Sequence, residues 1–257
     1  MQENALEIES LEKTYASGTR ALQGVSFAIP VGGFHALLGP NGAGKTTIIG
    51  IVTDLVNKTA GKVKVFDHDI DSEPETAKSL IGLVGQEINF NPFEKVIDIV
   101  VNQAGYYGIP RRMAIPRAEK LLRELGLGEK MNQTGFTLSG GMKRRLMIAR
   151  GLIHEPRLLI LDEPTAGVDV ELRRSMWEYL RGLHKEGLTV LLTTHYLEEA
   201  EQLASHVVIL NKGSVAADGT MADILALHTG SEDRGGAFSG GRLEEVFMKL
   251  ISNKENV

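Results

Sequence analysis

Cysteine is missing from the 257-residue chain, so no disulfide, thiolate metal site or cysteine nucleophile can form. This absence suits a reducing compartment. An excess of positive charge is missing too, since 28 lysines and arginines stand against 33 acidic residues, for a net charge of −5. The balance gives no support to a general binder of nucleic acid or anionic membranes, and we expect no nucleic-acid partner.

Long apolar runs are absent as well. The longest, such as residues 158–161 and 207–210, are far shorter than the ~20 residues that span a bilayer. The first residues, M-Q-E-N-A-L-E-I-E, lack the basic and then apolar pattern of a signal peptide. With 42% apolar and 24% charged residues, the composition is that of an ordinary globular protein. We therefore expect a soluble chain that reaches a membrane only through a partner.

The stretch 34–52 reads F-H-A-L-L-G-P-N-G-A-G-K-T-T-I-I-G-I-V, an apolar run, a glycine-rich turn and a helical pattern. It satisfies G-x-x-x-x-G-K-[ST], the phosphate-binding loop. The glycines let the backbone N–H groups point inward at anionic oxygens, and the following helix directs its positive dipole end there. The predicted nucleotide-binding residues of this loop are Gly39, Pro40, Asn41, Gly42, Ala43, Gly44, Lys45, Thr46 and Thr47.

Two side chains of the loop have separate predicted roles. Lys45 can reach the β- and γ-phosphates as a point charge, which makes it a catalytic residue as well. The Thr46 hydroxyl can be a ligand of Mg²⁺. The sequence thus predicts a protein that binds a nucleoside triphosphate together with Mg²⁺.

A second acidic centre is expected at R-L-L-I-L-D-E-P, residues 157–164. Four apolar residues suit a strand buried on both faces, and open α/β sheets bind ligands at the carboxyl ends of their strands. We expect Asp162 to hold Mg²⁺ through water and Glu163 to act as the general base on the attacking water. The alternative is a pair of surface acids at a strand end.

Two further strand ends carry polar residues. Gln86 follows the predicted strand 81–85 and can reach Mg²⁺ or the attacking water, or it is simply a polar strand end. His195 follows the predicted strand 188–194, and we expect it to contact the γ-phosphate, although a histidine after a strand is usually structural. Tyr15 lies in a turn before the phosphate loop, where it is either an adenine-stacking platform or an edge-strand aromatic.

A second anion site is predicted at L-S-G-G-M-K-R-R-L, residues 138–146, where Ser139 is a credible helix cap. Taken alone, this pattern would indicate only an ordinary helix start. The cations at 143–145 form either a solvated helix face or a source of positive potential. Residues 239–241 repeat S-G-G without the apolar context, so we interpret them as unrelated.

The chain as a whole predicts an α/β protein with a mostly parallel sheet, N-terminal antiparallel strands and a helical insert. The expected core comprises residues 1–87 and 156–228, with a helical subdomain at about 88–155. Within that subdomain, Pro116 is interpreted as the start of a helix over 116–125. A flexible connector at 229–241 and a C-terminal helix and tail at 242–257 complete the expected organisation.

In this order, the motifs resemble those of the ATP-binding cassette (ABC) ATPases, P-loop NTPases with an inserted helical subdomain. The phosphate loop, Gln86, L-S-G-G, L-L-I-L-D-E, A-G-V-D at 166–169 and His195 each match a family motif. More narrowly, I-G-L-V-G-Q-E-I-N-F-N-P-F-E and S-G-G-M-K-R-R-L-M-I-A-R resemble the YadG-type ATPases of bacterial ABC-2 exporters. Met142 replaces a common glutamine, as it does in that subgroup.

The resemblance implies an ATPase that forms a head-to-tail dimer around two ATPs. Each ATP would be held between one chain's phosphate loop and the other chain's signature, Ser139, Gly140 and Gly141, with Asp169 also at the nucleotide. It further implies a separate ABC-2 membrane permease and a location on the cytoplasmic face of the cell membrane. We expect the permease to dock near residues 87–107, where Phe90, Phe93, Tyr106 and Tyr107 lie. The alternative is that these aromatics only attach the insert to the core.

Other functions fit the sequence less well. A soluble ABC ATPase acting on ribosomes or DNA is the main alternative, but ribosomal members usually carry two cassettes and this chain has one phosphate loop. DNA-repair members have a long coiled coil, whereas the insert here is short and interrupted by prolines. A GTPase or small kinase would leave L-S-G-G without explanation.

Overall fold

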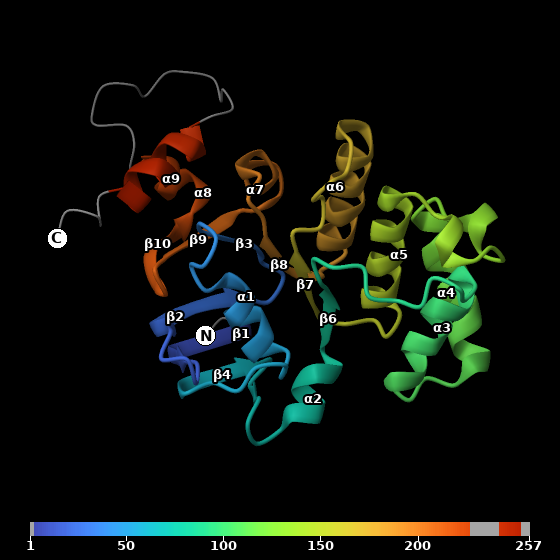
Figure 1. The fold of residues 1–257 in the computed structure, drawn as a ribbon, viewed down its shortest axis with the longest axis horizontal. Coiled ribbons are helices and arrows are strands. Elements are labelled where there is room, and N and C mark those ends of the chain that lie inside the picture. Colours follow the sequence, from blue (N-terminus) through green and yellow to red (C-terminus); the bar gives the residue numbers. More distant parts are fainter. Residues whose placement is uncertain (1–2, 227–241, 253–257) are drawn as a thin grey trace. The chain divides into compact units, whose positions relative to one another are not determined.

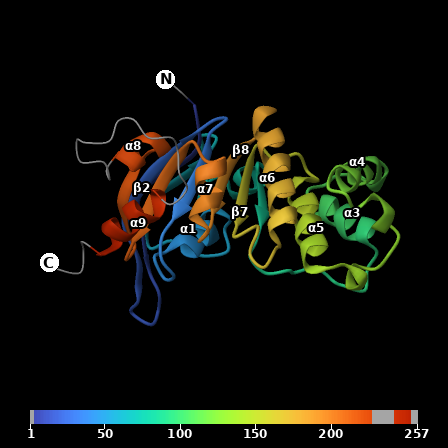
Figure 2. The same cartoon turned by 90° about the horizontal axis from the view of Figure 1, so that it is seen from above.

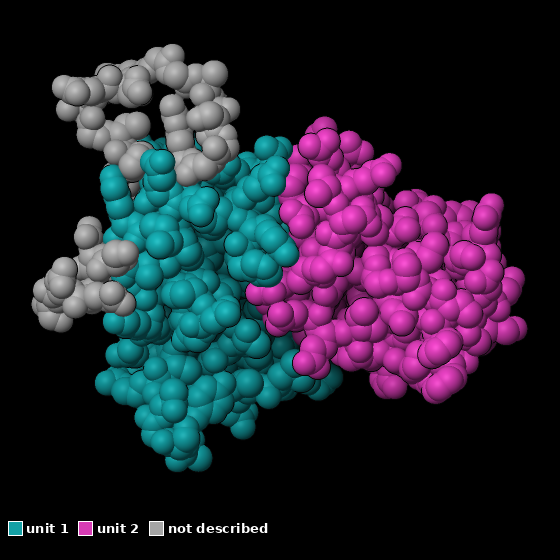
Figure 3. All heavy atoms as spheres, turned by 45° about the horizontal axis from the view of Figure 1, so that its top comes forward, with its two compact units in different colours: residues 1–78, 189–257 teal, residues 79–188 magenta. Residues whose placement is uncertain are grey.

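The computed structural model describes residues 3–226 and 242–252. The predicted connector 229–241 and the tail residues 253–257 lie outside the described part. The chain forms two compact units, one made of Met1–Lys78 and Thr189–Val257, the other of Ser79–Leu188 (Figure 3). Each unit is described in turn.

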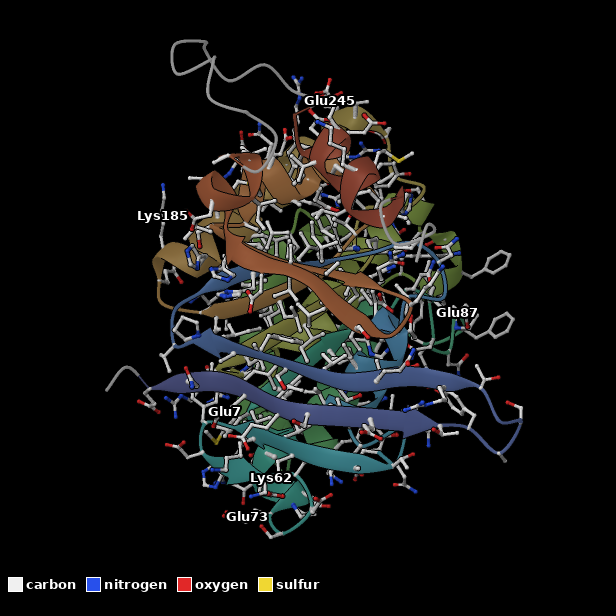
Figure 4. All side chains as sticks on the ribbon, turned by 90° about the vertical axis from the view of Figure 1, so that its left-hand side faces the viewer. Glu7, Lys62, Glu73, Glu87, Lys185 and Glu245 are labelled. Carbon is white, nitrogen blue, oxygen red and sulfur yellow. The ribbon has the colours of Figure 1, made fainter. Side chains whose placement is uncertain are left out.

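The first unit contains an antiparallel sheet in the order β2-β1-β4-β5. Its strands are β1 (Asn4–Thr14), β2 (Arg20–Pro30), β4 (Ala60–Val65) and β5 (His68–Asp69). Ile8 on β1 lies opposite Phe27 on β2 and Val63 on β4, and all three side chains are buried. Glu7 on β1 and Lys62 on β4 belong to the outer face (Figure 4). The alternation of apolar and charged residues therefore sets which face is buried.

A second sheet of the same unit positions the phosphate loop. In it, β3 (Phe34–Leu38) lies between the parallel strands β8 (Thr189–Thr193) and β9 (His206–Asn211), and β10 (Ser214–Thr220) is antiparallel to β9. Every residue of β3 and β8 is buried, as expected for parallel strands covered on both faces. The helices of this unit are α1 (Lys45–Val52), α2 (Pro74–Ser79), α7 (Leu197–Leu203), α8 (Met221–Ala226) and α9 (Arg242–Ser252) (Figure 1).

The second unit combines a parallel strand pair with helices. β6 (Ile81–Val84) runs parallel to β7 (Leu158–Asp162), and all five residues of β7 are buried. The helices are α3 (Val96–Tyr106), α4 (Arg111–Glu124), α5 (Gly140–Leu152) and α6 (Val170–Lys185), with short 3₁₀ turns at Gly128–Lys130 and Gly135–Thr137. α3, α4 and α5 pack on one another as a group (Figure 2).

The predicted α/β class, with antiparallel N-terminal strands and parallel strands preceding the motif residues, is confirmed. The prediction that Pro116 begins a helix is wrong. Pro110 has this role instead: it directly precedes α4, and its carbonyl accepts hydrogen bonds from the N–H groups of Met113 and Ala114 at 2.8 and 3.0 Å. Pro116 lies one turn further inside, on the exposed side of the helix.

Among the described helices, none combines the length and the apolar character that crossing a membrane requires.

Candidate nucleotide site

The phosphate loop connects β3 to α1 through tightly curled backbone. Gly42 and Gly44 have φ angles of +80° and +111°, a region that side chains other than glycine rarely adopt. Space is a second constraint at Gly44, since a Cβ atom there would lie 2.7 Å from Cδ2 of Leu22 and 2.9 Å from the carbonyl oxygen of Ala21. The loop is closed by a hydrogen bond of 3.1 Å from the N–H of Ala43 to the carbonyl of Pro40.

Lys45 turns its side chain back into this curl. Its ammonium nitrogen donates to the carbonyl oxygen of Gly39 at 2.6 Å and to that of Pro40 at 3.2 Å, and the residue is only 8% exposed. Thr46, the next residue, is exposed at the first turn of α1. A buried cation and an exposed hydroxyl therefore meet at one helix start, the arrangement predicted for phosphate and Mg²⁺.

Tyr15 lies next to the phosphate loop, although it is far away in sequence. Its hydroxyl is 3.2 Å from the hydroxyl oxygen of Thr47, and the Lys13 ammonium lies 4.9 Å from the ring centroid. The ring is 38% exposed. An exposed aromatic face beside the phosphate loop is what a base-stacking platform requires.

His195 reaches the same end of the second sheet from the neighbouring strand. β8 pairs with β3 in parallel, with Thr193 opposite Leu37, so that the residues after both strands lie at one edge. The His195 side chain is exposed, and its ring lies 4.1 Å from that of Tyr196. The first unit thus brings together the phosphate loop, Tyr15 and His195.

In the second unit, the structure brings Gln86 and Glu163 together. Val84 on β6 lies opposite Leu161 on β7, so that both strands end at the same level. Beyond these ends, the side-chain amide of Gln86 donates a hydrogen bond of 2.9 Å to Oε2 of Glu163. Two residues 77 positions apart in sequence are therefore in direct contact where strand ends place ligands.

The two acidic residues differ in their surroundings. Asp162 is the last residue of β7 and is 8% exposed, whereas Glu163 is half-buried. Glu163 also has a φ angle of +49°, a left-handed conformation that costs roughly 1 kcal/mol or more for a residue with a Cβ atom. Such strain at the predicted general base favours a functional role, because it turns the glutamate away from the direction of the strand.

The signature residues form the start of α5, as predicted. The Ser139 hydroxyl oxygen accepts a hydrogen bond of 3.3 Å from the N–H of Met142, and both Ser139 and Gly140 are exposed. Apart from Gly140 itself, its chain neighbours and the backbone of its own helix, no described atom lies within 4 Å of a Cβ built on Gly140. An exposed, capped start of a 13-residue helix can bind an anion from a second molecule.

Gly141 is enclosed by α6. A Cβ atom on Gly141 would overlap with Cδ2 of Leu172, so the start of α5 approaches α6 as closely as glycine allows. Leu172 is itself positioned by Asp169, which caps α6 by accepting a hydrogen bond of 2.9 Å from the Leu172 N–H. Asp169 therefore has a structural role in addition to its predicted place at the nucleotide.

Arg144 is a residue that the sequence interpretation missed. Of the two alternatives left open for the cations at 143–145, a solvated face does not hold at Arg144, which is only 5% exposed and donates to the carbonyl oxygens of Gly85 and Gln86, each at 2.8 Å. A signal was present in the sequence, since Arg144 precedes Met147, Ile148 and Gly151 at helical spacing on a buried face. A cation on such a face must have specific partners.

The predicted docking aromatics divide into two pairs. Phe93 and Tyr106 are 77% and 87% exposed, whereas Phe90 packs against Gly135 and Tyr107 stacks on His154 with ring centroids 3.6 Å apart. The sequence interpretation did not include Phe136, which is 66% exposed and stacks on Phe93 with centroids 6.2 Å apart.

A glycine loop that encloses a lysine at a helix start, and a buried strand that ends in an aspartate and a glutamate, define the class of P-loop nucleotide-binding ATPases. Within this class, the chain belongs to the ABC transporter family, because the family model "ABC transporter" matches residues 22–166. It is an ATP-binding, ATP-hydrolysing subunit of the kind that serves ABC-2 type exporters.

The similar proteins are named as ATP-binding proteins of drug-resistance and export systems. The chain is 40% identical over 220 residues to the daunorubicin/doxorubicin resistance ATP-binding protein DrrA of Streptomyces peucetius, covering 86% of the chain and 66% of DrrA. It is 38% identical over 252 residues to the linearmycin resistance ATP-binding protein LnrL of Bacillus subtilis, covering 98% of the chain and 80% of LnrL. A Nod factor export ATP-binding protein I of Paraburkholderia xenovorans is 35% identical over 232 residues, covering 90% of the chain and 76% of that protein.

Among solved structures, the ATP-binding cassette MJ0796 superimposes with a TM-score of 0.76 at 27% identity, covering 84% of this chain and 98% of that one. That structure is a dimer in a post-hydrolysis state, bound to ADP and Pi. The predicted ABC ATPase fold and the predicted family are both confirmed.

Proposed function

We propose that Glu163 is the general base of ATP hydrolysis and that Gln86 holds it in place. The hydrogen bond of 2.9 Å between the Gln86 amide and the Glu163 carboxylate carries this proposal. In the reaction, a water molecule gives its proton to Glu163 while its oxygen attacks the γ-phosphorus. The bond between that phosphorus and the β–γ bridging oxygen breaks, releasing ADP and phosphate.

The phosphate loop binds and orients the ATP phosphates in this proposal. The backbone N–H groups of residues 42–47 and the Lys45 ammonium neutralise the oxygens of the β- and γ-phosphates. His195 contacts the γ-phosphate, and Tyr15 stacks on the adenine. This is supported by the hydroxyl contact between Tyr15 and Thr47 and by the parallel pairing of β3 with β8.

The available oxygen donors also fit Mg²⁺. Thr46 would hold Mg²⁺ through its exposed hydroxyl, Gln86 through its amide oxygen and Asp162 through a water, because Mg²⁺ takes hard oxygen ligands together with phosphates and waters. When bound, Mg²⁺ neutralises charge on the phosphate oxygens.

Hydrolysis requires two chains in this proposal. Ser139, Gly140 and Gly141 bind the γ-phosphate of the ATP that the partner chain holds, and Asp169 also lies at that nucleotide. Support comes from the exposed, capped start of α5 and from the dimer formed by the related cassette MJ0796.

The membrane partner docks on the second unit, and it holds the ATPase at the cytoplasmic face of the membrane. The proposed docking surface comprises the aromatic residues Phe93, Phe136 and Tyr106, all of which are exposed. It is formed in part by the segment that directly follows Gln86. Exposed aromatic residues are well suited to such contacts because they bury a large area with few flexible bonds. A short cytoplasmic helix of the permease is the expected occupant.

The general-base assignment is tested by Glu163→Gln. This change keeps the shape of the side chain but removes the proton acceptor, so turnover should fall ~10²-fold or more while Mg²⁺-ATP binding stays nearly intact. Phosphate release and equilibrium ATP binding measure the two effects separately. Glu171→Gln, at an exposed carboxylate in the first turn of α6, is the matched control and should keep normal turnover. Near-normal turnover of Glu163→Gln would refute the assignment.

The docking surface is tested by Phe93→Ala and Phe136→Ala in the complex with the permease. Because both rings are exposed, their loss should leave the fold and the ATP affinity of the isolated chain unchanged but should reduce co-purification with the permease and transport. Leu55→Ala is the control, since Leu55 is 72% exposed on the first unit. If both phenylalanine variants retain a stable complex and transport, the docking site lies elsewhere.

A further inference from the structure

Both terminal nitrogens of the Arg144 guanidinium group donate hydrogen bonds to the backbone at Gly85 and Gln86. Nη1 donates to the carbonyl oxygen of Gly85 and Nη2 to that of Gln86, each at 2.8 Å. Two parallel hydrogen bonds from one planar group fix both position and orientation, which a lysine ammonium cannot do. Because the group is buried, these bonds are shielded from water and correspondingly stronger.

The backbone that Arg144 holds needs such support. β6 ends at Val84, so Gly85 and Gln86 lie beyond the hydrogen-bonding ladder with β7. Apart from Gly85 itself and its chain neighbours, no described atom lies within 4 Å of a Cβ built on Gly85, and the Gln86 side chain is exposed. The Gln86 amide still reaches Oε2 of Glu163 at 2.9 Å. Arg144 therefore holds the two carbonyl groups next to the side chain that makes this contact.

We propose that Arg144 is a positioning residue for catalysis: it links α5 to the Glu163 carboxylate through the backbone and side chain of Gln86. The path runs from the start of α5 at Ser139, along one helical turn to Arg144, then through Gln86 to Glu163. The inference rests on the proposed roles of Glu163 and of the signature. It means that a nucleotide bound at the start of α5 changes the geometry of the general base on the same chain.

A double-mutant cycle tests this link. Arg144→Gln should lower kcat at saturating ATP about tenfold with little change in KM, because the base is misplaced while the nucleotide is still bound. Gln86→Ala removes the side chain through which Arg144 is proposed to act on Glu163. In the Gln86→Ala background, Arg144→Gln should therefore have almost no further effect on kcat. Arg144→Lys keeps the charge but loses the paired hydrogen bonds, so its loss should be intermediate.

Arg145→Gln is the matched control. Arg145 is the next residue of α5 and also donates to a backbone carbonyl, that of Leu125 at 2.9 Å, but it does not bond to the Gln86 segment. Its variant should keep the wild-type kcat in both backgrounds. If Arg144→Gln does not fold, the cycle is made with Arg144→Lys, and thermal unfolding of each variant confirms that it is folded.

Two results would overturn the inference: an unchanged kcat in Arg144→Gln, or an equal fold-loss with and without Gln86. The second result would mean that Arg144 acts on stability or on another part of the site. Failure of the proposed function looks different, because then Glu163→Gln or Gln86→Ala alone would leave kcat unchanged.

Discussion

At the scale of single residues, the site depends on close approaches and on strained backbone. Glu163 adopts a φ angle of +49°, and Gly141 lies so close to Leu172 that no Cβ atom fits without a shift. The left-handed backbone at Glu163 costs stability, whereas glycine at 141 permits a close contact that a Cβ atom would block; both residues belong to the proposed machinery. Strain that persists in a folded protein is held by its surroundings, here the buried strand β7 and the capped helix α6.

The contact between Gly141 and Leu172 gives a stability prediction. Gly141→Ala should destabilise the protein by roughly 1–3 kcal/mol, because the added methyl group overlaps with the leucine side chain. Combining it with Leu172→Ala should recover part of this loss. Gly140→Ala, whose methyl group would meet open space, is the control and should cost little. Urea unfolding of the wild type and the three variants measures these losses of stability. An equal loss for Gly140→Ala and Gly141→Ala would contradict the packing argument.

Single-residue roles were predictable where a local rule applies. Ser139 and Asp169 precede their helices and are caps in the structure; the cap at Ser139 was predicted from sequence. The partners of Arg144 were not predictable, since Gly85 and Gln86 lie 59 and 58 positions away in the chain. Only the packing of α5 beside the end of β6 determines which backbone groups this buried cation contacts. Phe136 was missed for the same reason, because its stacking partner Phe93 belongs to another loop.

At the scale of elements, parallel strands place the functional groups. β3 and β8 carry the phosphate loop and His195 at adjacent carboxyl ends, and β6 and β7 do the same for Gln86 and Glu163. The opposite end of β3 contains an unusual pair. His35 is buried and stacks on His206 of β9, with ring centroids 4.5 Å apart, and His206 also contacts Asp218 at 2.7 Å.

This histidine pair predicts a loss of stability in acid. Burial, together with the nearby charge of His206, lowers the pKa of His35 from 6.5 to about 4. Between these values the unfolded chain binds a proton that the folded chain does not, so stability is fully present above pH 6.5 and falls as the pH drops towards 4. His35→Asn should remove up to ~3 kcal/mol of this pH dependence. Urea unfolding from pH 7.5 to 4 measures it, and parallel curves for variant and wild type would contradict the prediction.

The positions of strands and helices could be predicted closely where the hydrophobic periodicity and the turn-forming residues indicate the same element. The strands predicted at 81–85 and 188–194 contain β6 (Ile81–Val84) and β8 (Thr189–Thr193). The start of α4 was misplaced because two prolines, Pro110 and Pro116, both fit a helix start. Local preference cannot decide between them; the structure has Pro110 before the helix.

At the scale of the whole molecule, one chain carries two helix starts suited to phosphate, α1 after the glycine loop and α5 after Ser139. Their presence in a family of ATP-hydrolysing subunits, one of which forms a dimer with ADP and Pi, supports the proposal that each ATP is shared between two chains. Sequence alone could provide both motifs. It could not provide the contacts within each unit that link Gln86 to Glu163 and Tyr15 to Thr47.

The most direct test of this account is the oligomeric state of the Glu163→Gln protein, measured by size exclusion with light scattering. Without a proton acceptor the variant should hold ATP unhydrolysed, so Mg²⁺-ATP should shift it from monomer to dimer with two bound nucleotides, and ADP should return it to monomer. Ser139→Arg, which places a bulky side chain at the exposed start of α5, should prevent the shift while each chain still binds ATP. A Glu163→Gln protein that binds ATP and remains a monomer, even together with the permease, would contradict the account.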